Sequence, residues 1–133
     1  MVGAGDMFLW SLLGHHGRGK YLPGVLPSVY RIHKDGIHSG VSRAKQYLMR
    51  LQTYYALHVF YQRLGSQDLA NYFLGQLALD GKNVLLQAGQ TKGIQMLYEL
   101  PNVIAEQVGG DFDIPTRALS EVLYRVIKDN SNL

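Results

Sequence analysis

Hydrophobic side chains recur every three or four positions along residues 42–64, a stretch that contains neither Gly nor Pro. This spacing stacks side chains on one face of an α-helix, so the stretch predicts a helix with a buried stripe. The stripe consists of Ala44, Leu48, Leu51, Tyr55 and Val59. From residue 54 to residue 61 the chain is apolar nearly all round, which predicts a central helix that neighbours cover on several sides.

A second helix is predicted directly after the central one. Gly65 suits the end of the central helix, and Ser66 suits the N-cap of the next, so the two form an antiparallel hairpin. Apolar positions at helical spacing then continue to Asp80. Two interpretations remain open from there, because the helix can end at Gly81 or run on to Gly89.

Two more helices are predicted in the last third of the chain. Thr91 suits the N-cap of one of them, and Pro101 must kink that helix or open a fresh turn, because proline lacks an N–H. Pro115 fits the first turn of the last helix, which runs to residue 129. The buried stripe predicted for this last helix is Leu119, Val122, Leu123, Val126 and Ile127.

The first 41 residues are less regular. Asp6 suits the N-cap of a short helix that Gly14 ends, and the side chains expected to pack inward are Met7, Phe8, Trp10 and Leu13. Residues 14–41 hold six Gly and two Pro, which predicts an irregular loop with at most a short element around residues 28–33. Because no strand alternation is present, residues 1–133 are predicted to form one all-α domain, a bundle of four to five helices with a long Gly/Pro-rich N-terminal loop.

The composition of the chain indicates the cellular compartment in which the protein works. The chain has no Cys, which excludes disulfides, thiol catalysis and cysteine-ligated zinc, and fits a reducing compartment. No apolar run approaches the roughly 18 residues that span a bilayer, and the opening residues lack the basic region of a signal peptide. We therefore expect a cytoplasmic protein with no membrane partner.

Charge is distributed unevenly along the chain. Residues 1–63 hold eight Lys or Arg against Asp6 and Asp35, a net charge of +6, whereas residues 64–133 hold five bases against eight acids, a net charge of −3. Such a division suits a polyanion on one side and a protein neighbour on the other, with copies or partners aligned head to tail through opposite charges. The alternative is that these charged side chains serve only solubility and are unevenly distributed along the chain.

The candidate functional residues are the bases of the central helix and of the loop before it. Guanidinium and ammonium groups bind phosphates, and tyrosine rings such as Tyr47 and Tyr54 can stack on unpaired bases. No base-reading pattern is present, so the expected ligand is single-stranded DNA or RNA of any sequence. The predicted nucleic-acid-binding residues are Arg18, Lys20, Arg31, Lys34, Arg43, Lys45 and Arg50. The alternative is a solvated helix flank beside tyrosines that pack in the core.

Other chemistry finds little support in the sequence. The loop histidines His15, His16, His33 and His38 have no carboxylate at ligand spacing, and His58 lies on the half-buried side of the central helix, as a hydrogen-bonded core histidine does. The Gly-rich stretches do not match a nucleotide loop, and helix capping accounts for Asp111 and Asp113. We therefore expect no enzyme activity, no catalytic residue, no metal and no cofactor.

A basic helical bundle of this size resembles the small helical subunit of CRISPR effector complexes. That family has no short motif, so the resemblance transfers no residue roles beyond placing Arg43, Lys45, Arg50 and the loop bases on a suitable kind of surface. It implies a non-catalytic subunit of an antiviral ribonucleoprotein complex that contacts guide, target or displaced strand beside other protein subunits and copies of itself. The alternative is a helical protein-interaction module, such as a phage or plasmid accessory factor, without nucleic-acid binding.

Overall fold

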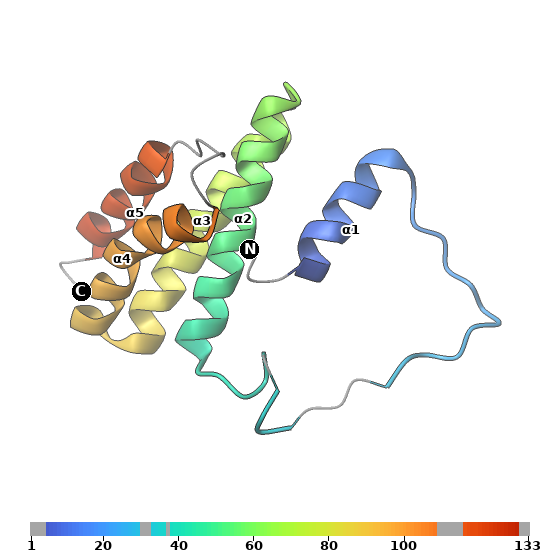
Figure 1. Ribbon diagram of the computed structural model, residues 1–133, viewed down its shortest axis with the longest axis horizontal. Coiled ribbons are helices and arrows are strands. Elements are labelled where there is room, and N and C mark those ends of the chain that lie inside the picture. Colours follow the sequence, from blue (N-terminus) through green and yellow to red (C-terminus); the bar gives the residue numbers. More distant parts are fainter. Residues whose placement is uncertain (1–4, 30–32, 37, 109–115, 131–133) are drawn as a thin grey trace.

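Five α-helices and no strand make up the part of the chain that the computed structural model describes, namely residues 5–29, 33–36, 38–108 and 116–130, with the backbone alone for residues 106–108 and 116. The helices are α1 (Gly5–His16), α2 (Arg43–Arg63), α3 (Gln67–Ala88), α4 (Gln90–Val108) and α5 (Thr116–Asn130). Helices α2 to α5 pack together, and α1 lies on the far side of α2 from α4 and α5 (Figure 1). The prediction of a single all-α domain is confirmed.

The central hairpin forms as the sequence predicts. The Ser42 hydroxyl accepts a hydrogen bond from the Lys45 N–H at 3.3 Å, which caps α2 at the predicted residue. Gly65 follows the helix with a φ of 73°, a left-handed conformation that favours glycine. Ser66 occupies the N-cap position of α3, but its side chain makes no capping hydrogen bond, so that part of the prediction is wrong.

Helix α3 continues through Gly81 to Ala88, which settles the choice that the sequence left open. Gly81 does not stop the helix because it lies on the buried face, where α5 packs against it. A Cβ at this position would lie 3.3 Å from Cγ1 of Val126. The glycine therefore serves close packing between two helices rather than a turn.

Helix α4 begins at Gln90, one residue before the predicted cap at Thr91. It packs closely on α3 at Gly93, where a Cβ would come within 2.9 Å of the Leu85 Cα. Pro101 lies inside this helix, which runs on without a new start. Pro115, the predicted first residue of the last helix, lies outside the described residues, as do Asp111 and Asp113.

The main core lies between α2, α3, α4 and α5. The predicted stripes of α2 and α5 are confirmed, with Leu48 and Val122 half-buried at the edge and the other members buried. Residues 54–61 are all buried or half-buried, as the apolar run of the central helix predicts. Among the described residues no helix combines the length and the apolarity that crossing a membrane requires.

Helix α1 differs most from the sequence-based expectation. It runs past Gly14 to His16, and Asp6 lies within its first turn, where its carboxylate accepts from the Met7 N–H. Among the described residues, one face of α1 contacts the rest of the protein: Phe8 packs on a second, smaller core cluster of Leu57, Tyr61 and Ala70, and Ser11 and His15 contact Tyr61. Trp10, with 70% of its surface exposed, and Leu13 point to solvent, so the prediction that they pack inward is wrong.

Candidate nucleic-acid interface

The predicted basic residues fall into two groups that lie apart. Arg18 and Lys20 belong to the loop that follows α1, and the end of α1 lies at the opposite end of the molecule from the start of α2 (Figure 1). Lys34 lies in a turn just before α2, and Arg43 and Lys45 lie in its first turn. These five side chains are exposed, whereas Arg31 lies outside the described residues.

The turn that carries Lys34 is tied to α2. The Gln46 side-chain amide donates to the carbonyl oxygens of His38 at 3.0 Å and Val41 at 3.3 Å. Within the turn, the Gly40 N–H donates to the Gly36 carbonyl at 2.7 Å. These hydrogen bonds hold the turn that carries Lys34 at the start of α2.

Arg43 and Lys45 flank the helix rather than share an edge. Two helical positions are rotated by about 200°, and Ala44 between them is buried. The first turn of α2 therefore presents one base on each side, with no acid among its residues. Arg43 shares its side of α2 with Arg50, seven residues further on, whereas Lys45 lies on the other side.

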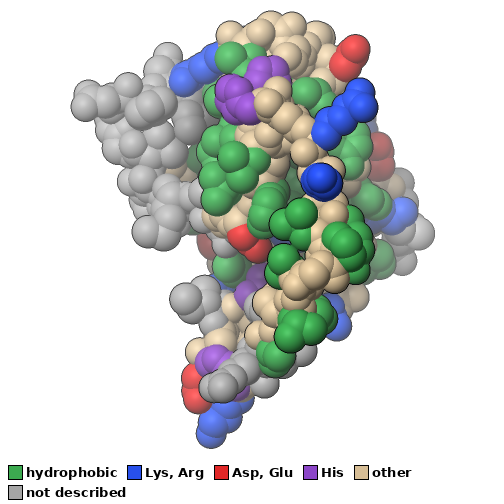
Figure 2. Space-filling model, turned by 90° about the vertical axis from the view of Figure 1, so that its right-hand side faces the viewer, with side chains coloured by type: hydrophobic (Ala, Val, Ile, Leu, Met, Phe, Trp, Pro, Cys, Tyr) green, Lys and Arg blue, Asp and Glu red, His purple; other side chains and the backbone are tan. Residues whose placement is uncertain are grey.

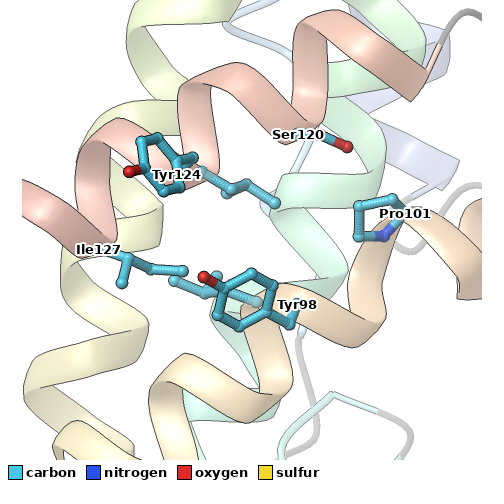
Figure 3. Close-up of a pocket in the computed structure, with 7 residues that line it drawn as sticks. Tyr98, Pro101, Ser120, Tyr124 and Ile127 are labelled. Atoms are coloured by element: carbon cyan, nitrogen blue, oxygen red, sulfur yellow. The ribbon is translucent and has the colours of Figure 1, made fainter.

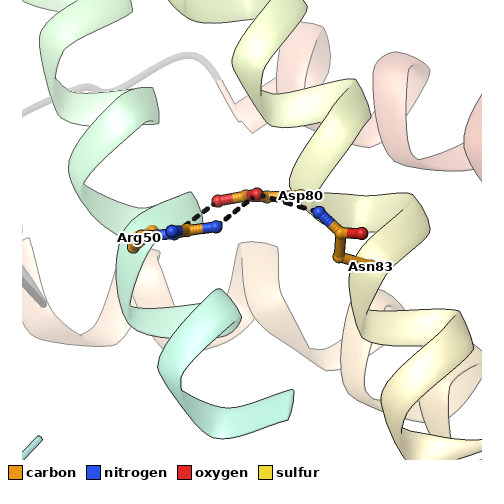
Figure 4. Close-up of polar contacts among 3 residues, drawn as sticks. All are labelled: Arg50, Asp80 and Asn83. Carbon is orange, nitrogen blue, oxygen red and sulfur yellow. Dashed lines mark hydrogen bonds and ion pairs between the residues drawn. The ribbon is translucent and has the colours of Figure 1, made fainter. Parts of the chain in front are cut away.

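Arg50 is engaged within the protein. Its Nε and Nη2 donate to the two carboxylate oxygens of Asp80 on α3, at 2.8 and 2.7 Å, and Asn83 donates to the same carboxylate at 3.3 Å (Figure 4). The guanidinium also lies 4.6 Å from the centre of the Tyr47 ring, within cation–π distance. Arg50 thus joins α2 to α3, and two of its donors are already used.

The exposure of this pair is unequal. The Asp80 side chain is 4% exposed and the Arg50 side chain 36% exposed. Burial of the guanidinium opposes its charge, but the hydrogen bonds to Asp80 and the charge of that carboxylate outweigh burial and raise the pKa of Arg50 above its usual value. Sequence reasoning did not identify Asp80 as a partner, although an acid on the core-facing stripe of a helix is a signal that a cation lies opposite.

The tyrosines beside these bases belong largely to the core. Tyr54 packs on Phe73 with 6.0 Å between ring centres, and burial followed by the charge of Asp80 raises the pKa of its phenol. Tyr47 packs on the edge of the main core beneath Arg50. Exposed rings instead belong to other elements, such as Trp10 on α1 and Tyr21 in the loop.

The histidines separate into loop residues and one core residue. His58 is buried, and its Nδ1 lies 2.9 Å from the Ala70 carbonyl oxygen, so Nδ1 carries the proton and donates. The prediction of a hydrogen-bonded core histidine is confirmed. Among the described residues no group of three or more His, Asp or Glu side chains converges as metal ligands.

An exposed apolar surface follows α1 and the loop after it, and we call it the N-terminal arm, residues 5–29. Viewed from that side, hydrophobic side chains run along the surface with Lys, Arg and His side chains among them (Figure 2). The exposed large apolar residues of the arm are Leu9, Trp10, Leu13, Tyr21, Leu22, Val25, Leu26 and Val29. Apolar surface of this extent commonly marks a site of association.

A small hollow of about 70 Å³ lies between α4 and α5 (Figure 3). Its wall is mainly apolar, and Tyr98 and Tyr124 stand at its rim. The lining residues are Leu97, Tyr98, Pro101, Ser120, Leu123, Tyr124 and Ile127. The set contains no carboxylate, no Lys or Arg and no histidine, so the hollow suits a small apolar group.

Comparison with known proteins places the chain in no group, because no family model, no curated protein and no solved structure matches it.

Proposed function

We propose that this protein is a non-catalytic, nucleic-acid-backbone-binding helical subunit of a larger ribonucleoprotein, and that the start of α2 contacts the phosphates. The supporting observation is the first turn of α2, which carries Arg43 and Lys45 and no acid. The N-terminus of a helix bears a partial positive charge and favours anions. Basic side chains beside it are therefore electrostatically unfavourable, and a bound anion relieves this repulsion.

Lys34 extends the same surface, because the turn before α2 is held against the helix by Gln46. Asp35 is the single acid within this turn, so bases still predominate around the helix start. Arg18 and Lys20 form a separate basic segment in the N-terminal arm. A single strand would need several nucleotides to contact both this segment and the start of α2. Arg50 contributes through the position of α2 rather than through a phosphate contact, because Asp80 accepts from two of its donors and pairs with its charge.

The resemblance to the small subunit of CRISPR effector complexes is one instance of this proposal. Its support is the five-helix bundle together with a basic N-terminal half. The ligand class would be single-stranded RNA or DNA of any sequence, because the surface offers charge and no base-reading side chains.

The test measures the affinity for DNA and RNA single strands of mixed sequence over a series of salt concentrations. The unaltered protein is compared with the double variant Arg43→Gln, Lys45→Gln. Each lost phosphate contact lowers the slope of log affinity against log salt by about 0.7 on single strands, so we expect a decrease of about 1.4. The matched control is Arg125→Gln, Lys128→Gln on α5, which removes two exposed charges and should leave the slope unchanged. An unchanged slope in the α2 variant would move the interface away from the helix start.

A second candidate function is a helical protein-interaction module, which the exposed apolar side chains of the N-terminal arm favour. Trp10 is the single tryptophan of the chain and is exposed, so its fluorescence reports on docking of the arm. Absence of single-strand binding at low salt, together with a blue shift of Trp10 emission on adding a protein partner, would favour this candidate over the first.

A further inference from the structure

Helix α3 carries a second exposed apolar stripe, on the face opposite the core. Tyr72, Leu79 and Leu86 follow one another at intervals of seven residues, the spacing that keeps side chains on one helical face. Their exposed fractions are 57%, 55% and 63%. The opposite face of the same helix holds the buried residues Leu77 and Val84, so α3 is apolar on both sides.

Gly75 lies in the middle of this outer face and is not explained by packing within the protein. A Cβ added there would meet nothing within 4 Å, and the residue is exposed in the interior of a helix. Glycine in such a position destabilises a helix by about 0.5–1 kcal/mol relative to alanine. Its absent side chain becomes useful where another helix crosses α3 closely.

Two opposite charges lie on this face at equal distances on either side of Gly75. Asp68 lies seven residues before it and Lys82 seven residues after it, each about 10.5 Å along the axis. Both are exposed, and neither belongs to the two ion pairs found among the described residues. The face is therefore acidic at one end, apolar in the middle and basic at the other end.

We propose that this face, comprising Asp68, Tyr72, Gly75, Leu79, Lys82 and Leu86, binds the same face of a second copy of the chain, with the two α3 helices antiparallel and a two-fold axis passing near Gly75. In that arrangement Asp68 of each copy meets Lys82 of the other. Tyr72 of each copy packs near Leu79 of the other, because these positions lie almost equally far from the centre on either side. The two glycines let the helix axes approach to about 8 Å, the close end of the normal range.

The charges select this arrangement over the alternatives. A parallel pair would place Asp68 beside Asp68 and Lys82 beside Lys82, which repel. A two-fold interface is closed at two copies, unlike the head-to-tail alignment that the division of charge along the chain suggests. The proposal is also independent of nucleic-acid binding, since the bases at the start of α2 take no part in it.

Charge reversal tests the pairing directly. Asp68→Lys alone places lysines opposite each other at both ends of the dimer, and Lys82→Asp alone places acids there. We expect each variant to dimerise roughly tenfold more weakly than the unaltered protein. An equimolar mixture of the two variants should recover the original affinity as a heterodimer, because both pairs are then complementary. Lys128→Asp on α5 is the matched control and should associate normally.

The centre of the face gives a second measurement. Gly75→Ala should raise the melting temperature of the monomer, because a single chain has room for a Cβ there. Gly75→Leu should separate the two helices and abolish dimerisation while the fold is retained. Association is measured by sedimentation equilibrium of the full chain and folding by circular dichroism. A mixture of the two charge variants that stays as weak as its components would overturn the proposal. So would an unaltered protein that remains monomeric at about 1 mM, and the face would then belong to a different partner.

Discussion

Separating Arg50 from Asp80 should destabilise the fold unequally, depending on which partner is removed. The two side chains join α2 to α3 through two short charge-assisted hydrogen bonds, and Asp80 is nearly inaccessible while Arg50 retains about a third of its exposure. Arg50→Met keeps an apolar side chain of similar length and leaves the buried Asp80 carboxylate without its cation, with the hydrogen bond from Asn83 remaining. Asp80→Asn keeps the shape and leaves an arginine that can turn toward water.

The magnitudes follow from this difference in burial. Removing one partner of a fully buried ion pair costs about 3–5 kcal/mol. Water reaches Arg50 in part, so the expected loss in the free energy of unfolding is about 2–3 kcal/mol for Arg50→Met and about 1–2 kcal/mol for Asp80→Asn. The double variant contains no stranded charge, so it should be about 1–2 kcal/mol more stable than the sum of the two losses implies.

The assay is urea unfolding of the four proteins of this double-mutant cycle, followed by circular dichroism at neutral pH. A coupling energy below about 0.5 kcal/mol would refute the reasoning, because distant, independent sites add within that margin. An Asp80→Asn variant less stable than Arg50→Met would also refute it, since that order requires Arg50 to be the more deeply buried partner. Glu121→Gln, which removes the exposed ion pair with Arg117 on α5, is the control and should change stability by less than about 0.5 kcal/mol.

Three further predictions concern the core and α1. Leu51→Ala should lower the free energy of unfolding in urea by about 2–5 kcal/mol, because Leu51 is fully buried in the main core. A loss under about 0.5 kcal/mol would contradict this burial, because the transfer free energy of the deleted atoms is lost even if the cavity collapses. Tyr61→Phe removes the hydroxyl that donates to the Ser11 carbonyl at 2.9 Å, so amide exchange should accelerate in α1 while α3 to α5 keep their protection. Burial raises the pKa of the Tyr55 phenol to about 12, so ultraviolet titration should show tyrosine ionisation that continues above the ordinary tyrosine range. The associated stability is complete below the ordinary tyrosine pKa of about 10 and is lost as the pH rises through the folded value.

The helices that pack on the core were predictable because their apolar positions repeat at the helical period. The caps also carried local signals, so α2 could be bounded to within a residue by Ser42 and Gly65. The course of α3 past Gly81 could not be predicted, because that glycine is selected by the approach of Val126 from α5, a contact between residues 45 positions apart. Helix α1 was predicted as a helix but not as an exposed one, since its apolar side chains exceed what its single contact face can bury.

For the candidate site, the sequence predicts which residue types are present but not the contacts that they make. The sequence shows that bases cluster before and within α2, and in the structure Gln46 holds the turn between Lys34 and Arg43 at the start of that helix. It could not show that Arg50 is engaged, since the partner Asp80 lies 30 residues away on another helix. Nor could it show that Tyr54 is packed on Phe73, because tyrosine occurs equally in cores and on stacking surfaces.

The short turn between α2 and α3 also determines how the chain reaches its structure. Because only residues 64–66 separate the two helices, bringing them together closes a very small loop and sacrifices little chain entropy. The α2–α3 hairpin is thus the part of the fold that can assemble earliest, and it provides the surface on which α4 and α5 condense. Helix α1 rejoins that surface across residues 17–42, a much longer closure, through a small set of contacts that includes the Tyr61–Ser11 hydrogen bond. We therefore expect α1 to dock last during folding and to be released first when the protein opens.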